Sequence, residues 1–272
     1  KVVLVNDGSK DKTWEIITKI HKENHMYVGI NLTRNRGHQN ALLAGLMYAK
    51  NHADICISMD ADLQDDINVM DDMIKKYNAG ADVVYGVRSS RKKDTFFKKF
   101  TAEAFYKLMN IMGVEVVFNH ADCRLMSKRA LEGLSEFKEV NLFLRGIVPQ
   151  VGYKTDIAYY ERSERVAGES KYPLKKMLAF AIDGITSFSI KPLRMITSIG
   201  FIILILSFVV LTYSVIMKLI GNTVSGWTFI VCSIWLIGGI QTLCLGVIGE
   251  YIGKIYKETK ARPRYIIECV LD

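Results

Sequence analysis

Two aspartates spaced two residues apart, Asp60 and Asp62, carry the clearest chemical signal in the sequence. They follow an apolar run at residues 55–59 that predicts a buried strand, so both side chains can point into one crevice. Two carboxylates suit Mg²⁺ or Mn²⁺ shared with a substrate diphosphate, because these ions keep positions for phosphate and water. Solvated turn chemistry is the alternative. Asp65 and Asp66 are expected to cap and open the next helix rather than bind a ligand.

A second polar loop, at residues 34–39, has the composition of a phosphate site. Its cationic residues, Arg34, Arg36 and His38, come directly before a segment rich in Ala and Leu that predicts a helix. Backbone N–H groups at a helix N-terminus and positive side chains both attract phosphate oxygens. A basic surface loop without a ligand is an equally good interpretation of these residues alone.

The elements that must position these loops follow an alternating pattern. Four apolar runs predict strands, and three longer segments between them predict helices. The strands are expected at residues 2–5, 27–32, 55–59 and 82–86, and the helices at residues 13–23, 40–51 and 66–78. This alternation predicts an α/β fold with a mainly parallel sheet and helices on both faces. Ligands bind such sheets at the carboxyl ends of the strands, which is where the polar loops lie.

Hydrophobicity is concentrated in the last third of the chain. Residues 196–217 form a run of 22 without a charge, and residues 219–249 a run of 31 with a turn-like stretch near its start. About 20 apolar residues span a bilayer as a helix, so we expect two transmembrane helices. The alternative is two buried helices of a soluble core, but such helices usually carry a polar stripe, which these runs almost lack.

Charge gives the expected orientation of this hairpin. Lys and Arg residues lie before the first run and after the second, whereas the loop between them offers only Lys218. By the positive-inside rule, both flanks and the preceding domain are cytoplasmic, at the cell membrane. Residues 172–194 carry apolar positions at helical spacing with lysines off that stripe, which predicts an interfacial helix in contact with membrane lipids. A core helix packed on the sheet is the alternative.

Composition excludes several classes of protein. The 272 residues include 36 Lys+Arg and 28 Asp+Glu, a formal charge of +8, and 50% are hydrophobic. A charged share of 24%, with 4 Pro and 5 Cys, rules out collagen, disordered chains and disulfide scaffolds. The cysteines form no CxxC pair, which favours a reduced setting without disulfides or zinc. Nucleic-acid binding is disfavoured, because the basic residues cluster around the apolar runs.

Five short motifs occur in order along nearly the whole chain. They are Asn-Asp-Gly-Ser at 6–9, Asn-Arg-Gly at 35–37, Met-Asp-Ala-Asp-Leu-Gln at 59–64, Asp-Cys-Arg-Leu-Met at 122–126, and Arg-Ser-Glu-Arg at 162–165 leading into Gly-Glu-Ser-Lys-Tyr-Pro at 168–173. This ordered set resembles the family 2 glycosyltransferases of the GT-A fold. Within them it is most similar to the membrane-anchored polyprenyl-phosphate glycosyltransferases related to dolichol-phosphate mannose synthase. The resemblance implies a Rossmann-like catalytic domain followed by interfacial helices and two transmembrane helices.

The resemblance also implies roles for single residues at the donor. Asp7 looks like the acidic residue that contacts the nucleotide base or ribose. Asp60 and Asp62 resemble the aspartates that bind the metal and the diphosphate, with Gln64 as a further ligand of Mg²⁺ or Mn²⁺. Two departures stand out. The family has another strand and a Pro-x-Tyr-Asn-Glu-like loop before the position of Lys1, and many relatives carry Lys at the position of His38.

Further roles concern catalysis and the acceptor. Asp122 falls on the aspartate often assigned as catalytic base, and Arg124 stands beside it; with Asp62 these are the expected catalytic residues. Arg145 has a weaker match. Because a phosphate monoester is already largely ionised near pH 7, Asp122 could orient the reactants more than remove a proton. A basic loop resembles one that closes over the phosphates, and its residues are Arg162, Arg165, Ser170 and Lys171.

The expected reaction moves one hexose, with inversion, from a nucleotide sugar such as UDP-glucose to a polyprenyl phosphate such as undecaprenyl phosphate on the cytoplasmic leaflet. The alternatives are a processive polysaccharide synthase and a non-catalytic membrane scaffold that retains the fold. Small residues in the second apolar run would also let copies of the chain pack as a homo-oligomer. The expected parts are a GT-A domain at residues 1–165, a basic loop with interfacial helices at 166–194, a transmembrane hairpin at 195–253 and a cytoplasmic tail at 254–272.

Overall fold

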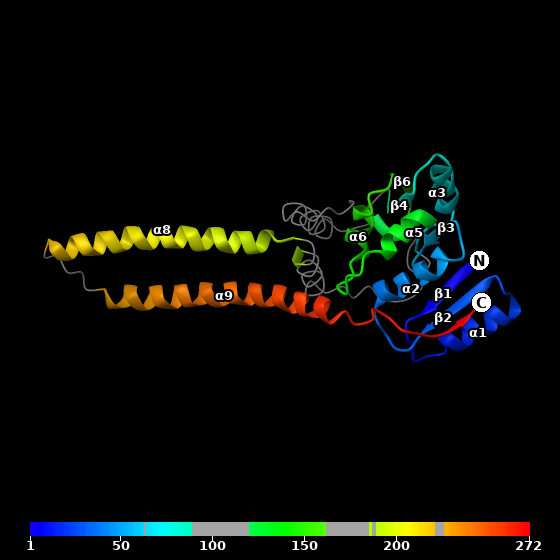
Figure 1. The fold of residues 1–272 in the computed structure, drawn as a ribbon, viewed down its shortest axis with the longest axis horizontal. Helices are drawn as coiled ribbons and strands as arrows, with labels where there is room; N and C mark the ends of the chain where they lie inside the picture. Colours follow the sequence, from blue (N-terminus) through cyan, green and yellow to red (C-terminus); the bar gives the residue numbers. More distant parts are fainter. Residues whose placement is uncertain (63, 89–119, 162–184, 187–188, 221–225) are drawn as a thin grey trace.

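The computed structural model describes residues 1–62, 64–88, 120–161, 185–186, 189–220 and 226–272 (Figure 1). The basic loop expected to close over the phosphates and most of the expected interfacial helix lie outside these residues. The described part combines an α/β domain with two long helices that extend away from it.

Seven strands and seven helices occur among the described residues. In chain order they are β1 (Val2–Asn6), α1 (Thr13–Glu23), β2 (Tyr27–Leu32), α2 (His38–Lys50), β3 (Ile55–Ser58), α3 (Val69–Asn78), β4 (Val83–Arg88), β5 (His120–Ser127), α5 (Lys128–Ser135), α6 (Leu144–Gln150), β6 (Thr155–Tyr160), α8 (Lys191–Leu219), α9 (Trp227–Lys260) and β7 (Ile267–Leu271). The first seven match the ranges predicted from the apolar runs to within about three residues, as expected for boundaries.

The strands form two mixed sheets, with the orders β1-β2-β7 and β3-β5-β4-β6. The α/β class is confirmed, whereas the expectation of a mainly parallel sheet needs correction. β2 pairs in parallel with β1 and β6 with β4, but β5 runs antiparallel to both β3 and β4, and β7 runs antiparallel to β2. An apolar run predicts a strand, but it carries no information about the direction of its partner, so the sequence pattern could not reveal this mixture.

Helices cover both faces of the second sheet and bury the hydrophobic core against it. α2, α5 and α6 bury apolar side chains against one face of β4, and α3 packs on the opposite face with Val69 and Met73. Along β4, Val83 and Tyr85 face the first layer and Val84 faces the second, because successive side chains of a strand alternate between the two faces. The same alternation on β5 directs every second side chain toward α2 and α6.

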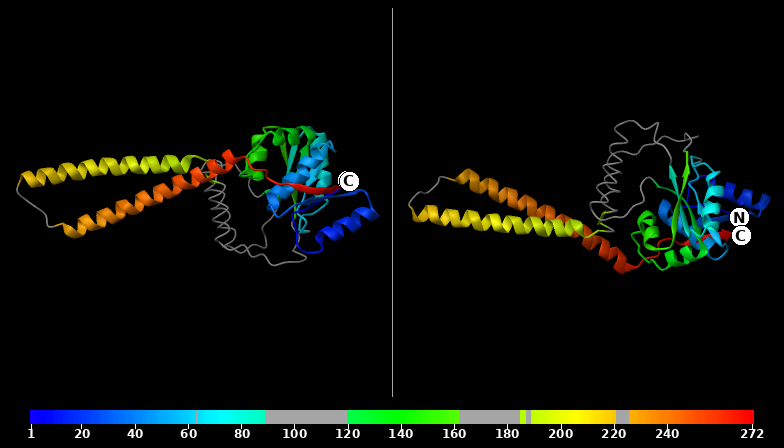
Figure 2. Two further views of the ribbon diagram at one scale, coloured as in Figure 1. Left: turned by 60° about the horizontal axis from the view of Figure 1, so that its bottom comes forward. Right: turned by 90° about the horizontal axis from the view of Figure 1, so that it is seen from above.

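α8 and α9 are long and apolar enough to cross a membrane. Within the apolar windows of both helices, at Lys191–Val210 and Leu236–Lys260, no part is buried by the rest of the described chain. This argues against the alternative of core helices in a soluble domain. In all three views the two helices leave the α/β domain in the same direction (Figures 1 and 2). The charge-free run predicted to end at residue 249 continues as helix to Lys260.

The chain returns from α9 to the α/β domain through a short tail. Ala261 adopts a left-handed backbone conformation with φ of 44°, which ends the helix. The tail then forms β7, which adds a third strand to the β1-β2 sheet and brings Asp272 to within 2.7 Å of the Lys1 amine. Figure 1 shows both ends of the chain beside this sheet.

Candidate active site

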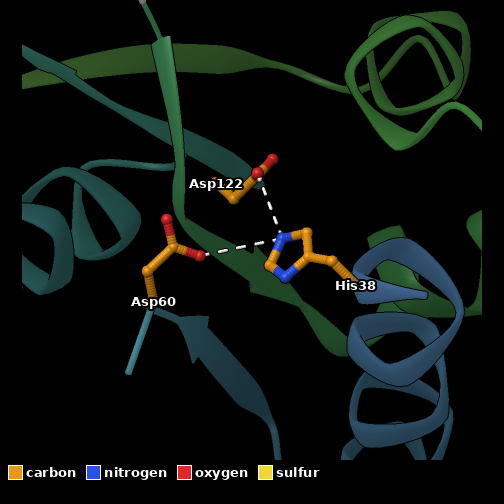
Figure 3. Close-up of side chains that lie close together, drawn as sticks. All are labelled: His38, Asp60 and Asp122. Carbon is orange, nitrogen blue, oxygen red and sulfur yellow. Dashed lines mark hydrogen bonds and ion pairs between the residues drawn. The ribbon is translucent and has the colours of Figure 1, made fainter. Parts of the chain in front are cut away.

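His38, Asp60 and Asp122 meet at one edge of the second sheet (Figure 3). His38 is the first residue of α2, Asp60 follows β3, and Asp122 lies near the start of β5. Because β5 runs antiparallel to β3, with Ser58 opposite Arg124, the start of β5 reaches the same edge as the end of β3. His38 Nε2 lies 3.2 Å from Asp122 Oδ2 and 3.7 Å from Asp60 Oδ1.

Asp122 is also held by two arginines. Arg124 Nη2 donates to Asp122 Oδ1 at 2.9 Å, because residues two apart on a strand share a face. Arg145, on the first turn of α6, donates from Nη2 to Oδ2 at 3.0 Å and from Nε to Oδ1 at 3.2 Å. The weaker sequence match at Arg145 therefore marks a residue that the fold brings to Asp122 in a bidentate contact.

Burial separates the two arginines. The side chain of Arg124 is 0% exposed, whereas that of Arg145 is 28% exposed. Arg124 therefore lies behind Asp122 and orients it, and Arg145 lies where a bound molecule can reach its guanidinium. The expectation that Arg124 acts in catalysis is better framed as an orienting role, and it stays a prediction.

The surrounding cations determine the ionisation of Asp122. Burial alone would raise the pKa of the Asp122 carboxyl, but the hydrogen bond from His38 and the charges of Arg145 and Arg124 outweigh it. The net result holds the pKa of Asp122 well below its usual range. A carboxylate this strongly stabilised is a weak proton acceptor near pH 7, which favours an orienting role for Asp122 over that of a general base.

Asp60 lies in the opposite electrostatic situation. Burial raises the pKa of its carboxyl, the negative charge of Asp122 raises it further, and His38 partly offsets both effects. The hydrogen bond to Asp122 in turn raises the pKa of His38 despite the partial burial of the ring. Two carboxylates this close therefore favour a positive charge between them.

The donor atoms at this edge fit a divalent cation. One ligand atom each from His38, Asp60 and Asp122 lies within 4.8 Å of the others, a spacing that an ion could bridge. This group shares Asp60 with the ligand set predicted from the resemblance but does not include Asp62 or Gln64. Asp62 is half-buried and its Oδ1 accepts the backbone N–H of Gln64, which is itself buried. The roles predicted for Asp62 and Gln64 stay predictions.

Asp7, which directly follows β1, joins the end of that strand to the loop at residues 34–39. Its carboxylate accepts the backbone N–H groups of Arg36 at 2.7 Å and Gly37 at 2.9 Å. Gly8 lets the loops approach, since it has a φ of 63° and a Cβ there would lie 2.5 Å from the backbone of Arg34. Asp7 thus supports the loop that precedes α2, and its predicted contact with the nucleotide stays a prediction.

The loop at residues 34–39 contains a buried side-chain nitrogen that is suited to an anionic ligand. Arg34 is exposed and Arg36 is half-buried. The Nε atom of Arg36 is buried and has no hydrogen-bond partner among the described residues. A buried, unsatisfied guanidinium nitrogen is costly unless a ligand oxygen or water meets it. This supports the phosphate interpretation of the loop over that of a plain basic surface.

Two neighbouring predictions were wrong. Asp65 and Asp66 do not cap and open the next helix, because α3 begins at Val69 and its N-cap is Asn68. Asp65 is instead buried and accepts a hydrogen bond from Tyr160 Oη at 2.6 Å, and Asp66 accepts the backbone N–H of Asn68. The partner of Asp65 lies 95 positions away, so local capping rules could not find it.

Sequence reasoning missed two residues that support the site, and four predicted residues lie outside the described ranges. Ser58 Oγ donates to the carbonyl of Asp122 at 2.7 Å, and Gln39 Oε1 accepts the N–H of Leu144 at 2.8 Å. Gln39 thereby fixes the start of α6 next to α2. No residue pattern signals either contact. The predictions for the closing loop fall outside the described part of the chain, and they concern Arg162, Arg165, Ser170 and Lys171.

Comparisons with known proteins identify the family of the chain. Residues 1–135 match the family described as Glycosyl transferase family 2. The chain is 54% identical over 271 residues to the Bacillus subtilis protein named uncharacterized glycosyltransferase YkoT, covering 100% of this chain and 80% of that protein. It is 44% identical over 270 residues to the bactoprenol glucosyl transferase of Shigella phage SfX, covering 98% and 88%. A prophage bactoprenol glucosyl transferase homolog of Escherichia coli K12 is also 44% identical, covering 99% and 88%.

The matches to these relatives cover nearly the whole chain, including the residues of both long apolar helices. The chain therefore belongs to glycosyl transferase family 2 and is a glycosyltransferase.

Proposed function

We propose that the protein transfers glucose from a nucleotide sugar, UDP-glucose first among the candidates, to a polyprenyl phosphate at the cytoplasmic face of a membrane. The observation that carries the proposal is the site in which Asp122 is fixed by Arg124 and Arg145 beside Asp60 and His38. Relatives named bactoprenol glucosyl transferases, matched along nearly the whole chain, support the acceptor and the sugar.

Donor binding would use the edge formed by α2 and β3. Arg36 offers a buried Nε atom without a partner among the described residues, and α2 begins at His38 with its N-terminus at the same edge. Both features favour phosphate oxygens. Asp60, with His38 or with Asp62 and Gln64, would hold Mg²⁺ or Mn²⁺. Such an ion would supply positive charge to the departing diphosphate.

The chain's own residues would orient the acceptor. Arg145 is partly exposed and points its guanidinium at Asp122, so its accessible face can meet an acceptor phosphate. The phosphate oxygen forms a bond to the anomeric carbon while the bond from that carbon to the diphosphate oxygen breaks. The acceptor needs no base, because a phosphate monoester with a second pKa of about 6 is already ionised at pH 7. A single displacement of this kind inverts the anomeric carbon.

The two apolar helices would place the site at the membrane. α8 and α9 would form the transmembrane hairpin of residues 195–253, and the positive charges at its two ends favour a cytoplasmic catalytic domain. Residues 166–194 would form the basic and interfacial segment. A polyprenyl chain could then remain in the bilayer while its phosphate reaches Arg145.

The test is transfer by the full chain reconstituted in bilayers with Mg²⁺ or Mn²⁺, labelled nucleotide sugars and polyprenyl phosphate. We expect lipid-linked glucose, and we expect Asp60→Asn and Asp62→Asn to lower the rate by about 10²- to 10³-fold, in line with the loss of one electrostatic contact to a developing charge. Asp66→Asn is the matched control, because the Asp66 side chain accepts hydrogen bonds only from Asn68 among those described. Its rate should stay within about twofold of wild type.

Failure to form a lipid-linked sugar from any common donor would contradict the proposed function. Unchanged transfer in Asp62→Asn alone would show that Asp62 is not a metal ligand, and Asp60 and His38 would remain the candidate ligands. Unchanged transfer in both variants would exclude the metal site at this edge.

A further inference from the structure

The last turn of α9 is tied to the loop that leads into α6. The Glu258 carboxylate accepts the backbone N–H of Val140 at 2.8 Å, the backbone N–H of Asn141 at 2.7 Å and the Asn141 Nδ2 group at 2.7 Å. A carboxylate in the last turn of a helix is disfavoured by the helix dipole. Helix stability therefore does not explain Glu258, whereas its three contacts with the loop do.

The same loop ends at the active site. Three residues after Asn141, Leu144 donates its N–H to Gln39 and its carbonyl lies 3.5 Å from Arg124 Nη1. The next residue, Arg145, forms the bidentate contact with Asp122. Phe143 and Leu144 are buried, so this short stretch is fixed by packing as well as by hydrogen bonds.

A second contact holds the loop through the tail that follows α9. Arg264 Nη1 donates to the carbonyl of Phe137 at 3.0 Å. Tyr265 packs against both the core under α2 and the core of the β1-β2 sheet. Glu258 in the last turn of α9 and Arg264 in the tail after it thus both hold residues 137–141.

We propose that Glu258 is a positioning residue for sugar transfer, which ties α9 to residues 140–145 and so sets Arg145 against Asp122. The inference rests on the proposed function and adds a specific connection between a membrane helix and the site. Glu258 touches neither substrate in this scheme and acts through Arg145. The position of α9 in the bilayer is thereby transmitted to the group that meets the acceptor phosphate.

The first measurement compares two glutamates of the same helix in the full chain, reconstituted in bilayer nanodiscs. Glu258→Ala should lower kcat for transfer to polyprenyl phosphate by about tenfold to a hundredfold, since small misplacements of a reacting group have effects of that size. The KM for the nucleotide sugar should change by less than about twofold, as expected for an interaction that acts on the transition state. Glu250→Ala, on the same helix, should leave both parameters near wild type.

Glu258→Gln provides a second variant that keeps the shape of the side chain and one carbonyl acceptor. The kcat of Glu258→Gln should lie between that of wild type and that of Glu258→Ala. A rise in the KM for the nucleotide sugar and a fall in kcat, together with lower thermal stability in both variants, would indicate a merely structural role and overturn the proposal.

A double-mutant cycle tests whether Glu258 acts through Arg145. Residues in one network show non-additive effects, whereas independent residues multiply their losses. Glu258→Ala combined with Arg145→Ala should therefore transfer glucose no more slowly than the slower single variant. Losses that multiply would overturn the connection.

Hydrogen exchange provides a readout that needs no turnover. In Glu258→Ala the backbone N–H groups of Val140 and Asn141 should exchange faster, because both lose their acceptor, while those of the β1-β2 sheet should not change. Unchanged exchange at residues 140–145 would overturn the connection even if the enzyme is active. A wild-type chain that transfers no sugar would instead contradict the proposed function, and the exchange result would still decide whether α9 and the loop are connected.

Discussion

The sheet that contains β5 and the helix pair α8 and α9 are stabilised in opposite ways. In the first, even a charged side chain is fully enclosed: Arg124 is 0% exposed and its charge is met by Asp122. In the second, large apolar side chains such as Phe201 and Leu245 are 64% and 68% exposed. The first region is specified by contacts within the chain. The second exposes its apolar surface, which a bilayer would cover in the proposed arrangement.

The strongest test of this comparison replaces the buried cation with an apolar side chain of similar length. Arg124→Met leaves Asp122 with two of its three cationic partners and removes the one that is fully buried. Breaking a buried ion pair destabilises a protein by about 3–5 kcal/mol, so the α/β domain should unfold at a clearly lower temperature. Thermal unfolding of the full chain in detergent micelles measures the effect.

The control is Lys19→Met, which breaks an exposed pair with Glu23 on α1. Its unfolding free energy should change by less than about 1 kcal/mol. Equal losses of unfolding free energy in the two variants would show that the buried Arg124–Asp122 pair stabilises the fold no more than an exposed pair.

A charge placed on an apolar helix should weaken membrane insertion and leave the stability of the α/β domain unchanged. Ile205 is 52% exposed in the middle of the apolar part of α8. Ile205→Lys should oppose membrane insertion by about 2.5–3.5 kcal/mol, the range for a lysine at the centre of a spanning helix. The thermal unfolding of the α/β domain should remain unchanged.

Fractionation of membranes from expressing cells measures this insertion, with Ile205→Leu as the apolar control. Full retention of Ile205→Lys in the membrane, together with a destabilised α/β domain, would contradict the assignment of α8 as a spanning helix.

A smaller effect concerns Asp82, a buried carboxylate of the α/β domain. The hydrogen bond from Arg129 lowers the pKa of Asp82, burial partly opposes this, and Ser127 adds a further hydrogen bond. A group with a depressed folded-state pKa contributes stability above its unfolded pKa of about 3.9, and loses it as pH falls through the folded value. Asp82→Asn should therefore destabilise the domain by about 1–3 kcal/mol at pH 7.

The difference between Asp82→Asn and wild type should narrow below pH 4, and thermal unfolding at pH 7 and pH 3 measures it. A difference that stays constant or grows toward pH 3 would show that the charge of Asp82 is not what stabilises the folded state.

Local patterns were sufficient for much of the fold. The strand at residues 27–32 and the helix at residues 13–23 were predicted with the bounds that β2 and α1 have, because apolar spacing and helix periodicity are local properties. The two apolar helices were predicted from length and absence of charge. The extension of α9 to Lys260 was not, because the charged residues after residue 249 could equally have formed a loop.

The site was only partly accessible to sequence reasoning. Asp60, His38 and Asp122 were each singled out, but as parts of separate motifs. Their meeting depends on β5 running antiparallel to β3, which no spacing encodes. Arg145 shows the same limit, because it reaches Asp122 through a loop held by Gln39 and Glu258, and those contacts cross 105 and more positions of the chain. Long-range packing, rather than local preference, assembles the site.

The strand β7 has a consequence for biosynthesis. Asn31 of β2 hydrogen-bonds to Glu268 of β7, 237 positions later in the chain. At a synthesis rate of about 5–20 residues per second, roughly 10 to 50 seconds pass between translation of β2 and translation of its outer neighbour. During that time β2 is an edge strand with an open row of backbone groups, which is a template for pairing with other chains. The nascent enzyme therefore depends on translation of both apolar helices before its first sheet can close.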